Sequence, residues 1–238
     1  MISIKRVIVA LVWLVMLGMP IYVVLNELPP GFWGLADANV IRAVFMRLIG
    51  LALFTLITQQ ILMQEFRPFF SKIMGPYFTK RYHIIVGTFT LLFALLHPIL
   101  YYVSALAQGS RFLDVASGQG YPWPTRYFYL LGPFSLLILI CTALSGLLRR
   151  AKWLQKYWYL IHKLNYLLFI TAFVHSWNVG SDVQTNQIIR TLWLVYLTVI
   201  VLGFINKFVL TKYRARFNQT TASESSNGEP VKPLTAES

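Results

Sequence analysis

Long apolar segments alternate with short polar ones along most of the chain. Six segments are long enough to supply the roughly 20 helical residues that cross a bilayer. They are residues 6–25, 41–63, 83–106, 127–148, 158–178 and 188–210. Strands of a membrane barrel would be about half as long and would alternate polar with apolar residues. Because lipid offers the backbone no hydrogen-bond partner, the pattern predicts an all-α integral membrane protein, a bundle of six transmembrane helices.

The first apolar segment could be mistaken for a signal peptide, because Lys5 and Arg6 precede it. It is longer than the apolar region of a signal peptide, and no cleavage pattern of small residues follows it. We therefore expect a retained first helix.

The composition agrees with a protein solvated by lipid, since 57% of the residues are hydrophobic and 12% are charged. The net charge of +13 could also suggest a nucleic-acid partner. The basic residues, however, gather in the loops on one face of the predicted bundle. They are Lys5, Arg6, Arg67, Lys72, Lys80, Arg81, Arg149, Arg150, Lys152, Lys156, Lys207, Lys212, Arg214 and Arg216. Membrane topology explains this bias without nucleic acid, and it predicts that both termini are cytoplasmic, in a bacterial inner membrane.

Two regions are predicted, a transmembrane domain over 1–216 and a disordered cytoplasmic tail over 217–238. The tail is polar and nearly free of large apolar residues. It is too short for a cofactor-binding domain, and neither a dinucleotide fingerprint nor a P-loop occurs elsewhere. The single cysteine, Cys141, leaves no intrachain disulfide and no cysteine metal site.

The four histidines of the chain are the strongest candidates for chemistry, because an ionisable ring within a membrane helix is costly unless it has a role. His83 and His97 are fourteen residues apart on the third predicted helix, and His162 and His175 are thirteen apart on the fifth. The two helices run in the same direction. We therefore expect two facing pairs, His83 with His162 and His97 with His175, roughly 20 Å apart across the membrane.

Haem is the cofactor that this arrangement favours. Each level lacks the carboxylates or thiolates that complete a zinc or non-haem iron site. A haem needs one axial ligand on each side of its plane, which two facing imidazoles can supply. The spacing on the fifth helix is less regular, because thirteen residues rotate an ideal helix by about 220° and fourteen return to within about 40°. Tilt or local distortion has to absorb this difference.

Two segments resemble the ferric reductase-like transmembrane domain superfamily. They are KRYHIIVGTFTLLFALLHPI (80–99) and YWYLIHKLNYLLFITAFVHSW (157–177). The superfamily includes NADPH oxidases, ferric-chelate reductases and the haem-binding membrane subunit of a periplasmic methionine sulfoxide reductase. The oxidases share the spacings of fourteen and thirteen.

The resemblance implies two b haems between the third and fifth helices. His83 and His162 would bind the iron of the cytoplasmic-side haem, and His97 and His175 the iron of the outer haem. The sulfoxide-reductase subunits resemble this chain in length and in lacking a flavin domain, but they usually have another residue at the position of His83.

Arg47 is a charged residue within the second predicted helix. It could pair with a haem propionate near the outer face, or it could extend to the membrane interface as arginines near helix ends do. The sequence leaves both interpretations open.

The function that these features predict is electron transfer through haem b, by a membrane component of an oxidoreductase. The donor would be a separate cytoplasmic flavoprotein that carries FMN or FAD, or membrane quinol. The acceptor would be ferric iron, oxygen or a periplasmic partner protein. Two alternatives stay open: a haem-binding subunit of a methionine sulfoxide reductase system, and a proton-relaying transporter without haem.

Overall fold

The computed structural model describes residues 4–210, and that part of the chain is helical with no strand. The long helices are α1 (Ile4–Asn26), α3 (Ala38–Glu65), α5 (Pro76–Ala107), α7 (Thr125–Leu147) and α12 (Gln187–Phe204). The shorter ones are α2 (Phe32–Leu35), α4 (Arg67–Met74), α6 (Phe112–Ser117), α8 (Lys152–Gln155), α9 (Trp158–His162), α10 (Asn165–Val179) and α11 (Ser181–Thr185), and a π-helical turn, η1 (Ile205–Leu210), follows α12. Within the described residues, five helices are long and apolar enough to cross a membrane: α1, α3, α5, α7 and α12 with the start of η1.

The structure differs from the prediction of one continuous helix over residues 158–178. This segment is not one helix, because α9 ends at His162 and α10 begins at Asn165. The N–H of Lys163 is shared between the carbonyls of Tyr159 and Leu160, which is the tight hydrogen bonding of a 3₁₀ turn. The break lies where polar residues interrupt the apolar run. With 15 residues, α10 is shorter than a full span, so a bundle of six continuous transmembrane helices is not confirmed.

Capping side chains define where two of the long helices begin. The carboxylate of Asp37 accepts hydrogen bonds from the N–H groups of Asn39 and Val40 at the start of α3, at 2.7 and 2.9 Å. The side-chain oxygen of Asn186 accepts in the same way from Ile188 and Ile189 at the start of α12. Each cap satisfies donors that a helix start leaves without intrahelical partners.

Helix α3 lies at the centre and contacts α1, α5, α10 and α12. The ring of Phe54 on α3 stacks on Trp193 of α12 and Phe169 of α10, with centroids 4.8 and 5.5 Å apart. Large apolar side chains on the outside remain exposed, which suits a protein surrounded by lipid. The most extensive helix contacts are those of α3 with α5 and of α7 with α10. These helices carry His83, His97 and His175, and His162 lies on α9.

The first helix is part of this bundle. The carbonyl of Trp13 accepts a hydrogen bond from Gln59 of α3 at 3.0 Å, and that of Met16 accepts one from Tyr196 of α12 at 2.9 Å. These contacts pack α1 against α3 and α12, and its retention stays a prediction. The predicted tail, 217–238, lies outside the described residues.

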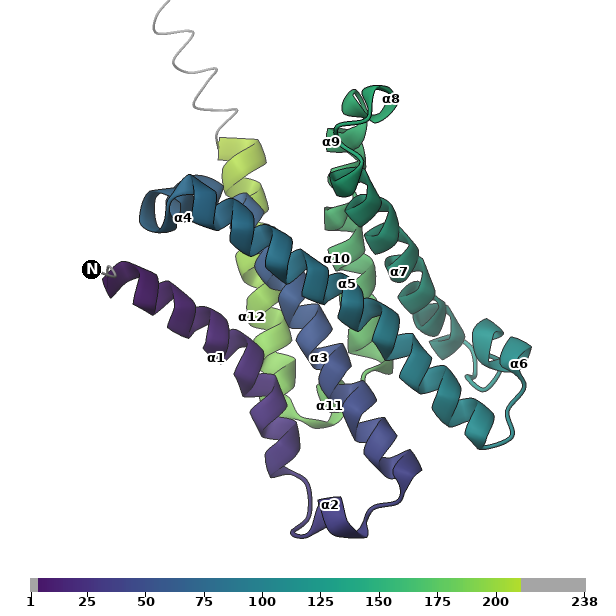
Figure 1. Ribbon diagram of the computed structural model, residues 1–238. Helices are drawn as coiled ribbons and strands as arrows, with labels where there is room; N and C mark the ends of the chain where they lie inside the picture. Colours follow the sequence, from purple (N-terminus) through teal and green to yellow (C-terminus); the bar gives the residue numbers. More distant parts are fainter. Residues whose placement is uncertain (1–3, 211–238) are drawn as a thin grey trace, which may run out of the picture.

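The bundle has two distinct ends (Figure 1). Helices α4, α8 and α9 and the turn η1 lie at one end, and α2, α6 and α11 at the other. We call the first the basic end, because α4, α8 and the loops beside them carry Arg67, Lys72, Arg149, Arg150, Lys152 and Lys156. The second is called the far end. The start of α1 belongs to the basic end, since Arg6 donates a hydrogen bond to the Ile73 carbonyl of α4 at 3.3 Å.

Candidate functional site

The structure brings His83 and His162 together at the basic end. His83 lies near the start of α5, and His162 is the last residue of α9. Their ring centroids are 5.9 Å apart, and the ring planes are inclined by 74°. Two metal–imidazole bonds of ~2 Å, with ~1 Å from each nitrogen to its ring centre, would separate two rings around one metal ion by about 6 Å. The spacing of this pair therefore fits two axial ligands.

The break between α9 and α10 bears on the irregular spacing of His162 and His175. A 3₁₀ turn advances by about 120° per residue, whereas an α-helix advances by about 100°. Over the two residues between α9 and α10 this adds about 40°, whereas about 140° separates the two faces on an ideal helix. The turn therefore accounts for only part of the difference.

His97 and His175 line one cavity towards the far end. The cavity has a volume of about 510 Å³ and lies between α3, α5, α7 and α10, with α11 beneath it. A volume of this size is in the range of sites for cofactors and other small molecules, which are mostly apolar with a few polar groups. The second pair thus shares one cavity in which a macrocycle could bind.

Each far-end ring is held by a main-chain carbonyl. Nδ1 of His97 is 3.1 Å from the oxygen of Met46, and Nδ1 of His175 is 2.9 Å from the oxygen of Phe128. A carbonyl only accepts, so each Nδ1 carries the proton and donates. In a neutral imidazole this leaves Nε2 with a free lone pair, the usual state of a metal-bound histidine.

Two glycines allow these rings to lie close to the neighbouring helices. A Cβ at Gly50 of α3 would be 2.9 Å from Cε1 of His97, and one at Gly132 of α7 would be 2.8 Å from Cε1 of His175. In both places the accepting carbonyl belongs to the residue four positions before the glycine, one helical turn away. The α3–α5 and α7–α10 pairs therefore repeat the same local arrangement.

The sequence interpretation missed Gly50 and Gly132. One signal was available, because Gly132 and Gly146 are fourteen residues apart on α7, as His83 and His97 are on α5. Glycine within an apolar helix often marks close packing. At Gly146, however, a Cβ would meet nothing within 4 Å, so the close approach occurs at the far level of α7 and not at the basic level.

Arg47 pairs with Asp182 at the edge of the far-end cavity. Its Nε is 3.1 Å from each carboxylate oxygen, and its Nη2 also donates to Oδ1. The Asp182 side chain is 6% exposed and that of Arg47 is 32% exposed. Asp182 is 135 positions away on α11 and was not a candidate from the sequence. The contact of Arg47 with a propionate stays a prediction.

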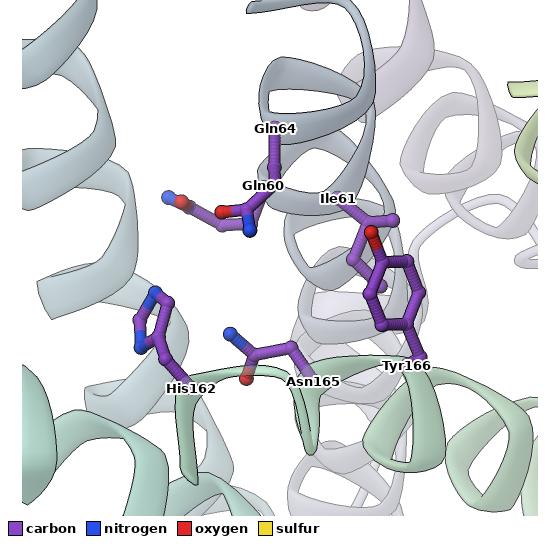
Figure 2. A pocket seen from close by; sticks show the side chains of 6 residues that line it. All are labelled: Gln60, Ile61, Gln64, His162, Asn165 and Tyr166. Carbon is purple, nitrogen blue, oxygen red and sulfur yellow. The ribbon is translucent and has the colours of Figure 1, made fainter. Parts of the chain in front are cut away.

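A small pocket lies beside His162 at the basic end (Figure 2). It has a volume of about 20 Å³, and its lining side chains come from α3 and from the segment that joins α9 to α10. They are Gln60, Ile61, Gln64, His162, Asn165 and Tyr166. The basic-end pair is therefore bordered by a space about the size of one water molecule, whereas the far-end pair borders the large cavity.

A buried ion pair lies next to this pocket. The Glu65 carboxylate accepts hydrogen bonds from Tyr166 and, at 3.2 Å, from the ammonium of Lys207. The Glu65 side chain has no exposed surface. Over residues 4–210, no group of three or more histidine, cysteine, aspartate or glutamate side chains could hold a metal ion. The histidines thus occur as two pairs, a donor set that suits a metal with other equatorial ligands, such as the iron of a haem.

Comparison with known proteins agrees with this arrangement. The model of a family described as ferric reductase like transmembrane component matches residues 45–173. The match includes His83, His97 and His162 and ends two residues before His175. No curated protein and no solved structure matches the chain. The match covers more than half of the sequence and confirms the resemblance seen in its motifs, so the chain belongs to the ferric reductase-like transmembrane family.

Proposed function

We propose that this protein binds two b haems and transfers electrons across the membrane between its basic end and its far end. Membership of the ferric reductase-like family supports transmembrane electron transfer. The observation that carries the haem proposal is the far-end pair, in which both Nδ1 atoms donate to carbonyls and both rings face one cavity of about 510 Å³.

Haem would supply reversible one-electron chemistry at each level. Within this proposal, His97 and His175 hold the far-end iron, and His83 and His162 hold the basic-end iron. The carbonyls of Met46 and Phe128 orient the far-end rings and increase their basicity, which stabilises the oxidised metal. Arg47 lies at the edge of the far-end cavity, where its guanidinium could pair with a propionate if it left Asp182.

The charge distribution supports an orientation in the membrane. Basic residues accumulate in cytoplasmic loops of membrane proteins, so the proposal places the basic end in the cytoplasm. The exposed basic residues of α4, α8 and the adjoining loops offer a positive surface to an acidic flavoprotein. Membrane quinol is the second donor that we consider. The acceptor at the far end would be chelated ferric iron, oxygen or an exported protein.

The haem content of the purified protein tests the proposal. We expect the spectrum of low-spin b haem and two haems per chain. The substitutions His97→Ala and His162→Ala should each remove one haem, whereas the exposed, unrelated Tyr127→Phe should remove none. A colourless protein, or a haem content that neither histidine substitution changes, would contradict the proposal and favour a transporter that relays protons.

A further inference from the structure

Gln59 is a buried polar residue that connects three helices near the basic end. It lies on α3 and is 2% exposed. Its Nε2 donates to the main-chain oxygen of Trp13 on α1 at 3.0 Å, and its Oε1 accepts from the hydroxyl of Tyr82 on α5 at 3.2 Å. Because a buried amide without partners is costly, these two bonds fix the side chain of Gln59 between α1 and α5.

The next residue of α3 holds the next residue of α5. Nε2 of Gln60 donates to the main-chain oxygen of His83 at 3.0 Å. Adjacent residues of a helix point about 100° apart around its axis, so the two bonds reach α5 at different angles. Bonds at different angles resist rotation of the helix as well as its displacement. Two neighbouring amides of α3 therefore fix the part of α5 that carries His83.

The ring of Tyr82 makes a second contact with α1. It stacks on the indole of Trp13, with centroids 6.1 Å apart and planes inclined by 24°. Trp13 also packs on Phe70 of α4, with centroids 5.5 Å apart. The Tyr82 side chain is thus held at its ring face and at its hydroxyl. Since Tyr82 and His83 are adjacent in one helix, fixing the first also fixes the direction of the Cβ of the second.

We propose that Gln59, acting through Tyr82, sets the orientation of the His83 ring relative to the ring of His162. The inference rests on the proposed function, since it concerns a haem ligand. Gln59 is a positioning residue, because it acts on the ligand through Tyr82 and the helix. The angle that it holds is the inclination of 74° between the two ring planes.

Electron paramagnetic resonance of the basic-end haem tests this proposal. Axial ligation is one of the means by which a protein tunes a haem. In a low-spin ferric haem, crossed imidazole planes leave two iron d orbitals nearly equal in energy, which gives a larger maximum g value than parallel planes give. We would record the signal in the His97→Ala background, which keeps the basic-end haem alone.

Gln59→Met keeps the length of the side chain but removes the amide, so the hydroxyl of Tyr82 loses its acceptor. The planes are already close to perpendicular, and a ring with more freedom therefore samples smaller angles. We expect the maximum g value to fall and the signal to broaden.

Tyr82→Phe makes the same test with a smaller change. It removes the hydroxyl and keeps the ring that stacks on Trp13, so the fold is retained even where Gln59→Met impairs it. The maximum g value should fall in this variant too. In the double variant the fall should be no larger than in Gln59→Met, because both substitutions break one chain of bonds. A fall equal to the sum of the two would overturn the proposal.

Tyr196→Phe is the matched control. The hydroxyl of Tyr196 also donates to a main-chain oxygen of α1, that of Met16 at 2.9 Å, and Tyr196 is also buried, but it lies on α12. This variant should be less stable and should keep the wild-type signal. An equal change in Tyr196→Phe, or an unchanged signal in both Gln59→Met and Tyr82→Phe, would overturn the proposal. A wild-type protein without haem would instead contradict the proposed function.

Discussion

At the far end, His97 and His175 donate to main-chain carbonyls one turn from a glycine, and both face a cavity of about 510 Å³. At the basic end, the ring centroids of His83 and His162 lie 5.9 Å apart beside a pocket of about 20 Å³. Main-chain carbonyls thus bond the far-end rings, whereas at the basic end the side-chain amide of Gln60 bonds the main chain of His83 and not its ring.

This difference determines which substitutions should affect each pair of histidines. A backbone carbonyl cannot be removed by changing its own side chain, so the far-end rings keep their acceptors unless a helix moves. The glycines are the exception, because any side chain there occupies the position of the ring. At the basic end the amide of Gln60 donates to the main-chain oxygen of His83, and a single substitution can remove this bond.

The largest expected effect is at Gly132. Gly132→Leu adds a side chain whose Cβ alone would lie 2.8 Å from the ring of His175, so the ring must leave its position. We expect loss of the far-end haem and retention of the basic-end haem. The haem-to-protein ratio and the reduced-minus-oxidised spectrum of the purified variant measure this.

Gly146→Ala provides the control on the same helix. A Cβ at Gly146 meets nothing within 4 Å, so the variant should keep the wild-type haem content. If Gly132→Leu and Gly146→Ala behave alike, the contrast between close packing at the far end and open space at the basic end is incorrect.

The four histidines and their pairing were accessible from the sequence, but the groups that surround the far-end pair were not. Spacing along two helices suffices to predict which ring faces which, because helix geometry is regular. Gly50 matters only because α5 presents His97 to it. Asp182 looks like an ordinary loop acid until the fold brings it to Arg47 from 135 positions away. Such long-range contacts depend on how helices pack, which periodicity does not specify.

The break in the fifth predicted span could not be predicted from the sequence either. No proline or glycine occurs between His162 and Asn165, so no breaker signals it. Polar residues at 163 and 165 occur at the edge of an otherwise apolar run, and helices in membranes tolerate such residues near their ends. The sequence therefore predicted the segment correctly as apolar and helical, but not that it is divided.

The second-largest expected effect is at the ion pair of Arg47 and Asp182, at the edge of the far-end cavity. Arg47→Met leaves the nearly buried carboxylate of Asp182 without its partner. Breaking a fully buried pair costs roughly 3–5 kcal/mol, and the partial exposure of Arg47 lowers the expected cost to about 2 kcal/mol. We expect a lower melting temperature in detergent, measured by intrinsic fluorescence.

The double variant Arg47→Met with Asp182→Leu sharpens this prediction. Replacing both charges by apolar groups removes the uncompensated carboxylate, so most of the lost stability should return. A double variant less stable than Arg47→Met would show that Asp182 stabilises the fold through other contacts. Because the basic end keeps its own pair of Glu65 and Lys207, the basic-end haem should remain in both variants.

The smallest effect concerns the contact between α7 and α10 beneath the far-end pair. The hydroxyl of Ser135 donates to that of Thr171 at 2.8 Å, and both residues are buried. Hydrogen bonds between membrane helices average about 0.6 kcal/mol. Ser135→Ala should therefore lower the stability only slightly. A hydroxyl has one proton, so Ser135 donates either to Thr171 or to the carbonyl of Leu131, while Thr171 donates to the carbonyl of Leu167. Each hydroxyl therefore keeps an acceptor on its own helix when the other is removed.

A double-mutant cycle with Ser135→Ala and Thr171→Val isolates this contact from the intrahelical ones. We expect a coupling energy near 0.6 kcal/mol and an unchanged spectrum of the far-end haem, because the carbonyl of Phe128 still holds His175. A change in that spectrum would mean that side chains, and not the backbone alone, position the far-end ring. The two ends of the bundle would then differ in degree rather than in kind.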